Sequence, residues 1–217
     1  MRILLAIAAV LTMTGCNGLP GRPTVGEEVA RPDQVLDFST LYTANCSGCH
    51  GAEGKGGASI ALRNPVFLAI ADDAAIRNVA SAGVPGTQMP PFAQSKGGML
   101  TDKQIDVLVQ GIRAWVPAGV PPESLPPYAA PTGDPQRGAT VYATFCAQCH
   151  QGAKASRIDN PAYLSLVSDQ YLRTVVIAGR PELGAPDWRG DVTGRPMTPE
   201  EISDVVAWLA TQRSTSK

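Results

Sequence analysis

Two five-residue segments of the chain carry residue types that attach a metal-containing ring. Residues 46–50 read Cys-Ser-Gly-Cys-His, and residues 146–150 read Cys-Ala-Gln-Cys-His. Two thiols at this spacing add to the two vinyl groups of one porphyrin, and the adjacent histidine then binds the iron as proximal ligand. The chain has no other histidine, so the pattern predicts two haems c. The predicted attachment residues are Cys46, Cys49, Cys146 and Cys149, and the predicted iron ligands are His50 and His150.

Two other chemistries use a Cys-x-x-Cys motif. Structural zinc normally pairs two half-sites about 12 to 20 residues apart, whereas the two motifs here are 100 residues apart. A redox dithiol needs a reactive cysteine in a βαβ context, and the sequence shows no such pattern. Haem is the preferred interpretation, and zinc and dithiol chemistry are its alternatives.

The amino terminus predicts export. Met1 and Arg2 form a short positive segment, and the apolar run over residues 3–13 is too short to span a bilayer comfortably. Small residues then lead to Cys16, which resembles a bacterial lipoprotein signal. We therefore expect a signal peptide over residues 1–15 and a lipid on Cys16, with an ordinary secretory signal as the alternative. Either signal places the protein outside the cytoplasmic membrane, on the periplasmic side.

Two stretches without hydrophobic periodicity divide the remaining chain. Residues 16–32 are rich in Gly, Pro and charge, which predicts a flexible tether. Residues 117–132 contain two Pro-Pro pairs, which predicts an extended linker. The predicted domains are therefore residues 33–116 and 133–217. Each is small for a self-sufficient core, and a central haem would add apolar volume.

The two domains are repeats of one another. The Ala-Gly pair at residues 82–83 corresponds to the Ala-Gly pair at residues 178–179, and the last helices align through Ile105 and Ile202. Helix signals also recur. Capping boxes open at Thr101 and Thr198, N-caps are expected at Asp33 and Asp134, and shorter helices are expected over residues 72–82 and 169–178. No segment alternates as a strand does, so the predicted fold class is all-α.

Each unit resembles a class I cytochrome c domain, with a first helix leading into Cys-x-x-Cys-His, a methionine-bearing loop and a last helix with an aromatic residue. Together the units resemble the tandem di-haem cytochromes c of bacterial respiratory chains, over nearly all of residues 33–214. The resemblance implies two tandem domains, each wrapped around one covalently bound haem. It also implies an electron carrier rather than an enzyme.

In this family the sixth iron ligand is usually a methionine followed by proline and, two residues on, an aromatic residue. The segment Met89-Pro90-Pro91-Phe92 matches, so the resemblance implies that Met89 is the sixth ligand of the first haem. Its alternative role is a core methionine. Met99 is a second candidate for this ligand, but it adjoins the start of the last helix of the first repeat, so we expect it to be a packing residue.

The second unit departs from the family pattern. Alignment without gaps from Ala178-Gly179 places Ala185 at the position of Met89, and alignment of the last helices through Ile105 and Ile202 places Met197 at the position of Leu100. Three states are therefore open for the second iron. Met197 is its sixth ligand after re-routing of the loop, or the position is empty or holds water, or a partner subunit fills it. Met197 is the preferred candidate of the three.

Groups around the haems can also be anticipated. No proline follows either histidine at the position from which this family often orients it, so a backbone carbonyl is expected to take that role. Four arginines are candidate partners for haem propionates, with solvated surface positions as the alternative. They are Arg63, Arg77, Arg157 and Arg173.

These features predict electron transfer outside the cytoplasmic membrane, within or to a membrane redox complex. The expected partners are a donor and an acceptor redox protein, in a respiratory or photosynthetic complex, and the membrane itself through the lipid. The net charge of −1 and the lack of a basic face argue against nucleic-acid binding. The alternative function is a five-coordinate second haem that binds small ligands or reacts with peroxide.

Overall fold

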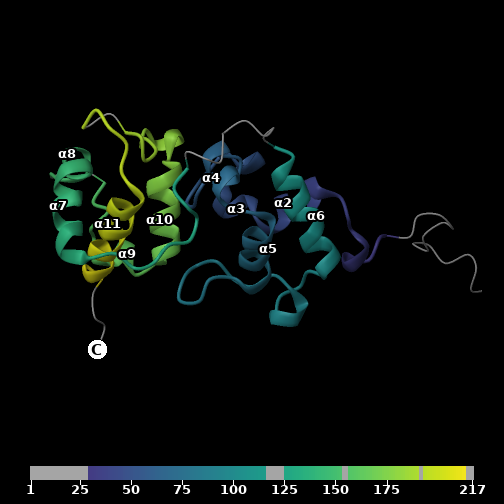
Figure 1. The fold of residues 1–217 in the computed structure, drawn as a ribbon. Helices are drawn as coiled ribbons and strands as arrows, with labels where there is room; N and C mark the ends of the chain where they lie inside the picture. The colour runs from purple at the N-terminus through teal and green to yellow at the C-terminus, as the bar shows by residue number, and fades with distance from the viewer. Residues whose placement is uncertain (1–28, 116–124, 153–155, 191–192, 214–217) are drawn as a thin grey trace, which may run out of the picture. The chain divides into compact units, whose positions relative to one another are not determined.

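The computed structural model describes residues 29–115, 125–152, 156–190 and 193–213 (Figure 1). The predicted signal peptide, the lipid site at Cys16, most of the tether and half of the Pro-rich linker lie outside these residues. The chain divides between Gln34 and Val35 into two units, and the second unit contains both repeats. In the first unit the described residues include one short 3-10 helix, η2 (Pro32–Gln34).

The described part of the chain is built from helices and turns. The first repeat contains α2 (Phe38–Asn45), α3 (Ser47–His50), η3 (Ala52–Gly54), α4 (Pro65–Ile70), α5 (Asp73–Ala82), η4 (Gln94–Lys96) and α6 (Asp102–Arg113). The second contains α7 (Pro135–Phe145), α8 (Ala147–His150), α9 (Pro161–Leu164), α10 (Asp169–Ala178), η6 (Pro181–Leu183) and α11 (Pro199–Thr211). Over these ranges no strand is present beyond isolated bridges, which confirms the all-α prediction. None of the described helices is long and apolar enough to cross a membrane.

Most helix starts lie where the capping residues predict them. Thr101 and Thr198 each form a complete capping box at the start of α6 and α11. The Asp134 carboxylate accepts a hydrogen bond from the Gln136 backbone N–H at 2.8 Å and caps α7. Such side-chain acceptors satisfy the backbone N–H groups that the first turn of a helix leaves unpaired.

The prediction that Asp33 caps the helix before Cys46 is wrong. Asp37 caps α2 instead, and its carboxylate accepts a hydrogen bond from the Thr40 N–H at 2.7 Å. Asp33 lies in η2, a turn in which the Gln34 N–H donates to the Arg31 carbonyl at 2.8 Å. The helix before Cys46 therefore begins at Phe38, four residues later than a cap at Asp33 would place it.

The first and last helices of each repeat pack closely through one glycine. In the first repeat a Cβ on Gly111 of α6 would lie 2.1 Å from the ring of Phe38 on α2. In the second repeat a Cβ on Gly138 of α7 would lie 2.0 Å from the Asp204 carbonyl oxygen and 2.7 Å from the Trp208 Cβ, both on α11. Figure 1 shows α7 and α11 side by side. Gly138 aligns with Phe38 and Trp208 with Gly111, so the large and small members of the pair are exchanged between the repeats.

An arginine fastens each last helix to the turn between two shorter helices. Arg113 at the end of α6 donates to the carbonyls of Leu68 and Ala71 and pairs with Asp73. Arg213, just after α11, makes the same three kinds of contact in the second repeat. Its partners are the Leu164 carbonyl at 3.0 Å, the Val167 carbonyl at 2.9 Å and the Asp169 carboxylate at 2.5 Å.

Among the described residues, two hydrogen bonds join the repeats. The Asn64 Nδ2 donates to the Ala178 carbonyl at 2.9 Å, while its Oδ1 caps α4. The Arg180 guanidinium donates to the Gly57 carbonyl at 2.8 Å. Asn64 is 6 % exposed and Arg180 is 8 % exposed, so both contacts are shielded from water. Buried polar groups need such partners, because an unpaired one costs about 1–3 kcal/mol.

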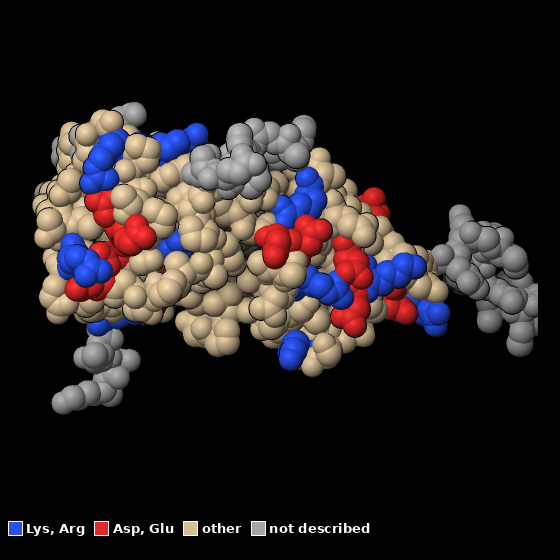
Figure 2. Space-filling view, viewed as in Figure 1, with Lys and Arg blue, Asp and Glu red and all other residues tan. Residues whose placement is uncertain are grey.

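Charges of both signs are interspersed over the surface. In the view of Figure 2, blue Lys and Arg side chains lie next to red Asp and Glu side chains. The salt bridges of the described residues account for this mixture, among them the pair of Arg137 with Asp204 and the pair of Arg195 with Glu201. The face in view therefore presents no field of one sign that would steer a highly charged partner.

Candidate functional site

Each Cys-x-x-Cys-His motif begins where the first helix of its repeat ends. The Cys46 N–H donates to the Tyr42 carbonyl at 2.8 Å, and the Cys146 N–H donates to the Tyr142 carbonyl at 2.9 Å. The motif then forms one further helical turn, α3 or α8. Residues three apart in a helix share a face, so the two thiols of each motif lie on one side with the histidine adjacent. None of these four cysteines forms a disulfide bond.

Both histidines are held in the same way by a backbone carbonyl. The His50 Nδ1 lies 2.9 Å from the Ile60 oxygen, and the His150 Nδ1 lies 2.8 Å from the Ser156 oxygen. Because a carbonyl only accepts hydrogen bonds, we assign the ring proton to Nδ1, which leaves the Nε2 lone pair for a metal. Ile60 and Ser156 thus supply the expected carbonyls. No side-chain signal marks them in the sequence, because every residue has a carbonyl.

The environment of His50 favours the neutral ring. The side chain is buried, and burial lowers the pKa of His50. The hydrogen bond to Ile60 opposes this shift in part, and the positive charge of Arg180 adds to the lowering of the pKa. A neutral imidazole is the form that binds metal. His150 is less enclosed than His50.

The cysteines fit thioether attachment better than the two alternatives. Burial raises the pKa of Cys46 and of Cys146 to about 11, whereas a redox-active dithiol needs a cysteine with a lowered pKa. Within the residues that the structure describes, no three His, Cys, Asp or Glu side chains converge as metal ligands. The two motifs are therefore not brought together as a zinc site. Two thiols and one oriented imidazole in each repeat are the donor set that haem c requires.

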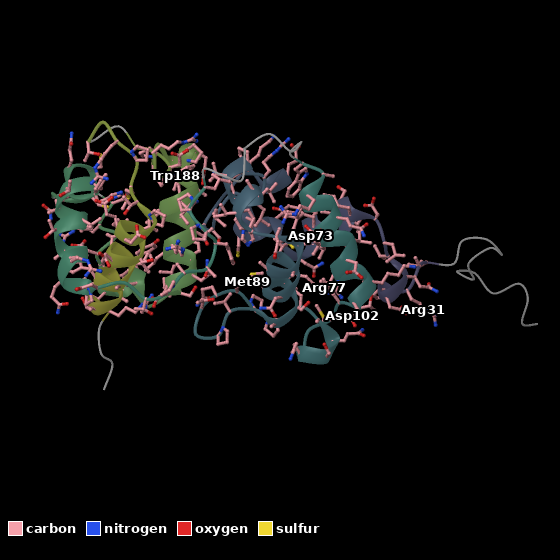
Figure 3. All side chains as sticks on the ribbon, in the orientation of Figure 1. Arg31, Asp73, Arg77, Met89, Asp102 and Trp188 are labelled. Atoms are coloured by element: carbon pink, nitrogen blue, oxygen red, sulfur yellow. The ribbon has the colours of Figure 1, made fainter. Side chains whose placement is uncertain are left out.

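Met89 lies on the loop between α5 and α6 (Figure 3). The loop turns back at once, because the Val84 N–H donates to the Met89 carbonyl at 2.9 Å. The Thr87 hydroxyl accepts from the Met89 N–H at 3.2 Å and donates to the Val84 carbonyl at 2.8 Å. The Met89 side chain is half-buried, and its role as sixth ligand stays a prediction. Met99 is 81 % exposed, so its expected role in packing is wrong.

The corresponding loop of the second repeat lies between α10 and α11. The Arg180 N–H donates to the Ala185 carbonyl at 2.9 Å. Trp188, labelled in Figure 3, is buried beside α10 and accepts at its carbonyl from the Met197 N–H at 2.9 Å. Met197 is 7 % exposed. Its role as an iron ligand also stays a prediction.

A polar cluster beside the second distal loop was not anticipated. Arg180 forms an ion pair with Glu182, and its guanidinium donates to the Tyr171 hydroxyl at 3.3 Å. Its third partner, Gly57, belongs to the loop after the first motif, where the Gly56 N–H donates to the His50 carbonyl at 2.9 Å. The aligned residues of the first repeat are Val84, Gly86 and Ala75. A position-by-position comparison of the repeats would have revealed this change from apolar to polar.

The four candidate propionate partners all bond to protein groups. Arg77 pairs with Asp102, both labelled in Figure 3, and also with Asp106, and Arg157 pairs with Asp159 at 2.8 Å. Arg63 pairs with Glu53 at 3.4 Å, and Arg173 donates to the Pro127 carbonyl at 2.8 Å and to the Ser203 hydroxyl at 3.1 Å. The Arg173 contacts fasten the end of the linker to the second repeat. A propionate role for any of the four stays a prediction.

The two repeats match one protein family. The family is described as cytochrome C oxidase, cbb3-type, subunit III, and its model matches residues 33–110 and again residues 133–209. The match thus covers more than half of the chain and includes both Cys-x-x-Cys-His motifs. No curated protein matches the chain.

Proposed function

Because the chain belongs to the family of cbb3-type cytochrome c oxidase subunit III, with two cytochrome c domains in tandem, we propose that it is a di-haem electron carrier that serves a membrane oxidase. The observation that carries the proposal is the repeated site. In both repeats two thiols and a histidine share one helical turn, and a carbonyl holds the histidine Nδ1 within 3 Å. Electron transfer is the general role of this family.

The residues of each site have separate tasks. A haem c in the site supplies a one-electron couple. The two cysteines of each motif fix the ring to the chain, and the carbonyls of Ile60 and Ser156 stop the imidazoles from rotating. In the first repeat the Met89 thioether would favour the reduced iron and complete its coordination. His50 is 8 % exposed, so little water reaches its ring.

We also propose that the protein is anchored outside the cytoplasmic membrane through a lipid on Cys16. The small residues before Cys16 and the short apolar run support this location. Changing Cys16→Ser should move the protein from the membrane fraction to the soluble periplasmic fraction, with the haem content unchanged. Retention of the variant, with its signal peptide removed, in membranes of a strain that lacks the oxidase would exclude Cys16 as the anchor.

The function is tested with holoprotein matured in a bacterial host. Two haems per chain and complete, reversible reduction are expected. Reduced protein mixed with membranes that contain a cbb3-type oxidase should be reoxidised by oxygen much faster than with membranes from a strain lacking that oxidase. Equal rates in the two membranes would contradict the oxidase as acceptor. Fewer than two haems, or irreversible reduction, would contradict electron transfer through both repeats.

A further inference from the structure

The distal loops of the two repeats share one backbone register. The Val84 N–H bonds to the Met89 carbonyl in the first repeat, and the Arg180 N–H bonds to the Ala185 carbonyl in the second, both at 2.9 Å. The glycine before each donor has φ near +67°, at 66° for Gly83 and 68° for Gly179. A Cβ on Gly83 would lie 2.6 Å from the carbonyl carbon of Pro90, and one on Gly179 would lie 2.7 Å from that of Pro186. Ala185 therefore holds the place of Met89 in space as well as in sequence.

Met197 holds the place of a core leucine. The Leu100 N–H donates to the Phe92 carbonyl at 2.7 Å, and the Met197 N–H donates to the Trp188 carbonyl at 2.9 Å. Leu100 is 6 % exposed and Met197 is 7 % exposed. Each residue directly precedes a capping-box threonine. Met197 therefore occupies the place that a buried packing residue fills in the first repeat.

The segment around Ala185 is suited to a small neutral molecule. Alanine has no atom that coordinates iron, and its side chain is half-buried next to Pro186. The charged side chains nearby are already paired, Arg180 with Glu182 and Arg189 with Asp187. Among the described residues of this loop no unpaired positive charge is left to attract an anion, and both histidines of the chain belong to the attachment motifs. The nearby carboxylates of Glu182 and Asp187 are held in these ion pairs, which makes them poor acid–base groups for peroxide chemistry.

We propose that the second haem binds a small neutral diatomic ligand at its sixth position, and that Met197 is a core residue. This inference rests on the proposed function, because it requires a haem c on each motif. The two repeats then have different roles. Met89 is the sixth ligand of the first iron, whereas Ala185 leaves the sixth position of the second iron accessible. Carbon monoxide is the probe, since it binds only ferrous haem with an accessible position.

The test is titration of the dithionite-reduced, full-length holoprotein with carbon monoxide, followed in the visible spectrum. Wild type should bind one carbon monoxide per chain. Met197→Leu, which copies the first repeat and keeps the buried volume, should bind the same amount with an unchanged thermal midpoint. Ala185→Met restores the methionine of the first repeat and should reduce the bound carbon monoxide from one per chain to none.

Two results would overturn the proposal. Wild type that binds no carbon monoxide while Met197→Leu binds one would identify Met197 as the ligand. If neither protein binds it, another group fills the position. Iron and haem per chain, measured on the same samples, separate this failure from failure of the proposed function. A chain with fewer than two haems contradicts both, whereas two haems with no carbon monoxide bound contradict this inference alone.

Discussion

The two histidines that we propose as iron ligands are each oriented by a main-chain atom rather than by another side chain. The carbonyls of Ile60 and Ser156 fix the imidazoles of His50 and His150. Substitution of Ile60 or Ser156 leaves the carbonyl in place, so this contact tolerates changes of residue type. The sixth position depends on the side chain instead, and there the repeats differ.

Met89 provides the clearest prediction at the scale of one residue. We expect Met89→Ala to add one carbon monoxide per chain to the amount bound by the reduced wild type, because an alanine methyl cannot coordinate iron. The reduction potential of the first haem should also fall, since the thioether favours ferrous iron. A carbon monoxide titration and an optical redox titration measure the two effects. If carbon monoxide binding is unchanged, Met89 is not the ligand.

Asp204 in the second repeat predicts a pH dependence of stability. Its side chain is 5 % exposed, and it accepts from the Asp134 N–H at 2.6 Å and from two nitrogens of Arg137 at 2.7 and 2.9 Å. These bonds, with that of Arg137 the largest cause, lower the pKa of Asp204 below its ordinary value of 3.8. The stabilisation is therefore fully present above pH 3.8 and is lost as the pH falls through the lower pKa of the folded state.

The variant Asp204→Asn should lose this acid-dependent part of the stability. At neutral pH we expect its free energy of unfolding to be about 1–3 kcal/mol lower than that of wild type, because the hydrogen bonds that residue 204 accepts lose the carboxylate charge. Denaturant unfolding of the holoprotein at a series of pH values measures both effects. Glu200→Gln removes an exposed charge from the same helix and is the control. If Asp204→Asn and wild type lose stability equally in acid, the Asp204 carboxylate is not the source of the pH dependence.

At the scale of helices, the exchanged glycine contact gives a matched pair of substitutions. A methyl on Gly138 would meet backbone, since the Asp204 carbonyl oxygen would lie 2.0 Å away. A methyl on Gly111 would meet the half-buried ring of Phe38, which can move aside. Gly138→Ala should therefore cost about 1–3 kcal/mol of unfolding free energy, and Gly111→Ala clearly less. Thermal and denaturant unfolding compare the two, and equal losses would contradict this account.

The helices themselves could be predicted from the sequence because their signals are local. Thr101, Thr198 and Asp134 each combine a capping side chain with the residues that follow it. Asp33 and Asp37 carry the same side chain four residues apart, and only the tertiary structure shows which of them starts the helix. The roles of Arg113 and Arg213 were not predicted either, because their carbonyl partners lie 42 to 49 residues away.

At the scale of the whole second unit, Arg180 links the sites of the two repeats. Its guanidinium bonds to Gly57, in the loop that leads back to His50 through the Gly56 N–H. A buried positive charge at this place disfavours ferric iron in the first haem. Arg180→Gln should therefore lower the reduction potential of that haem. Optical redox titration measures the shift, with the first haem identified by its response to Met89→Ala.

Arg189→Gln is the control for this prediction. It removes the same charge from an exposed position in the second repeat, where Arg189 pairs with Asp187. If both variants shift the first potential equally, the effect comes from net charge and not from the contact with Gly57. The sequence could not predict this link, because Arg180 and Gly57 are 123 residues apart. The repeat itself and the two attachment motifs could be predicted, because they depend only on residue types and their spacing in the sequence.

The exchange of large and small residues between the repeats has a consequence for how the chain reaches its native state. A tandem protein can misassemble when the first helix of one copy docks on the last helix of the other. In such a docking Phe38 would lie against Trp208, which places two large rings at one close helix crossing. Gly138 would lie against Gly111, which leaves a cavity between the two helices. Both mismatches are unfavourable, whereas both native pairs interlock. This contact therefore selects the native pairing, in which the first helix of each repeat packs on the last helix of the same repeat.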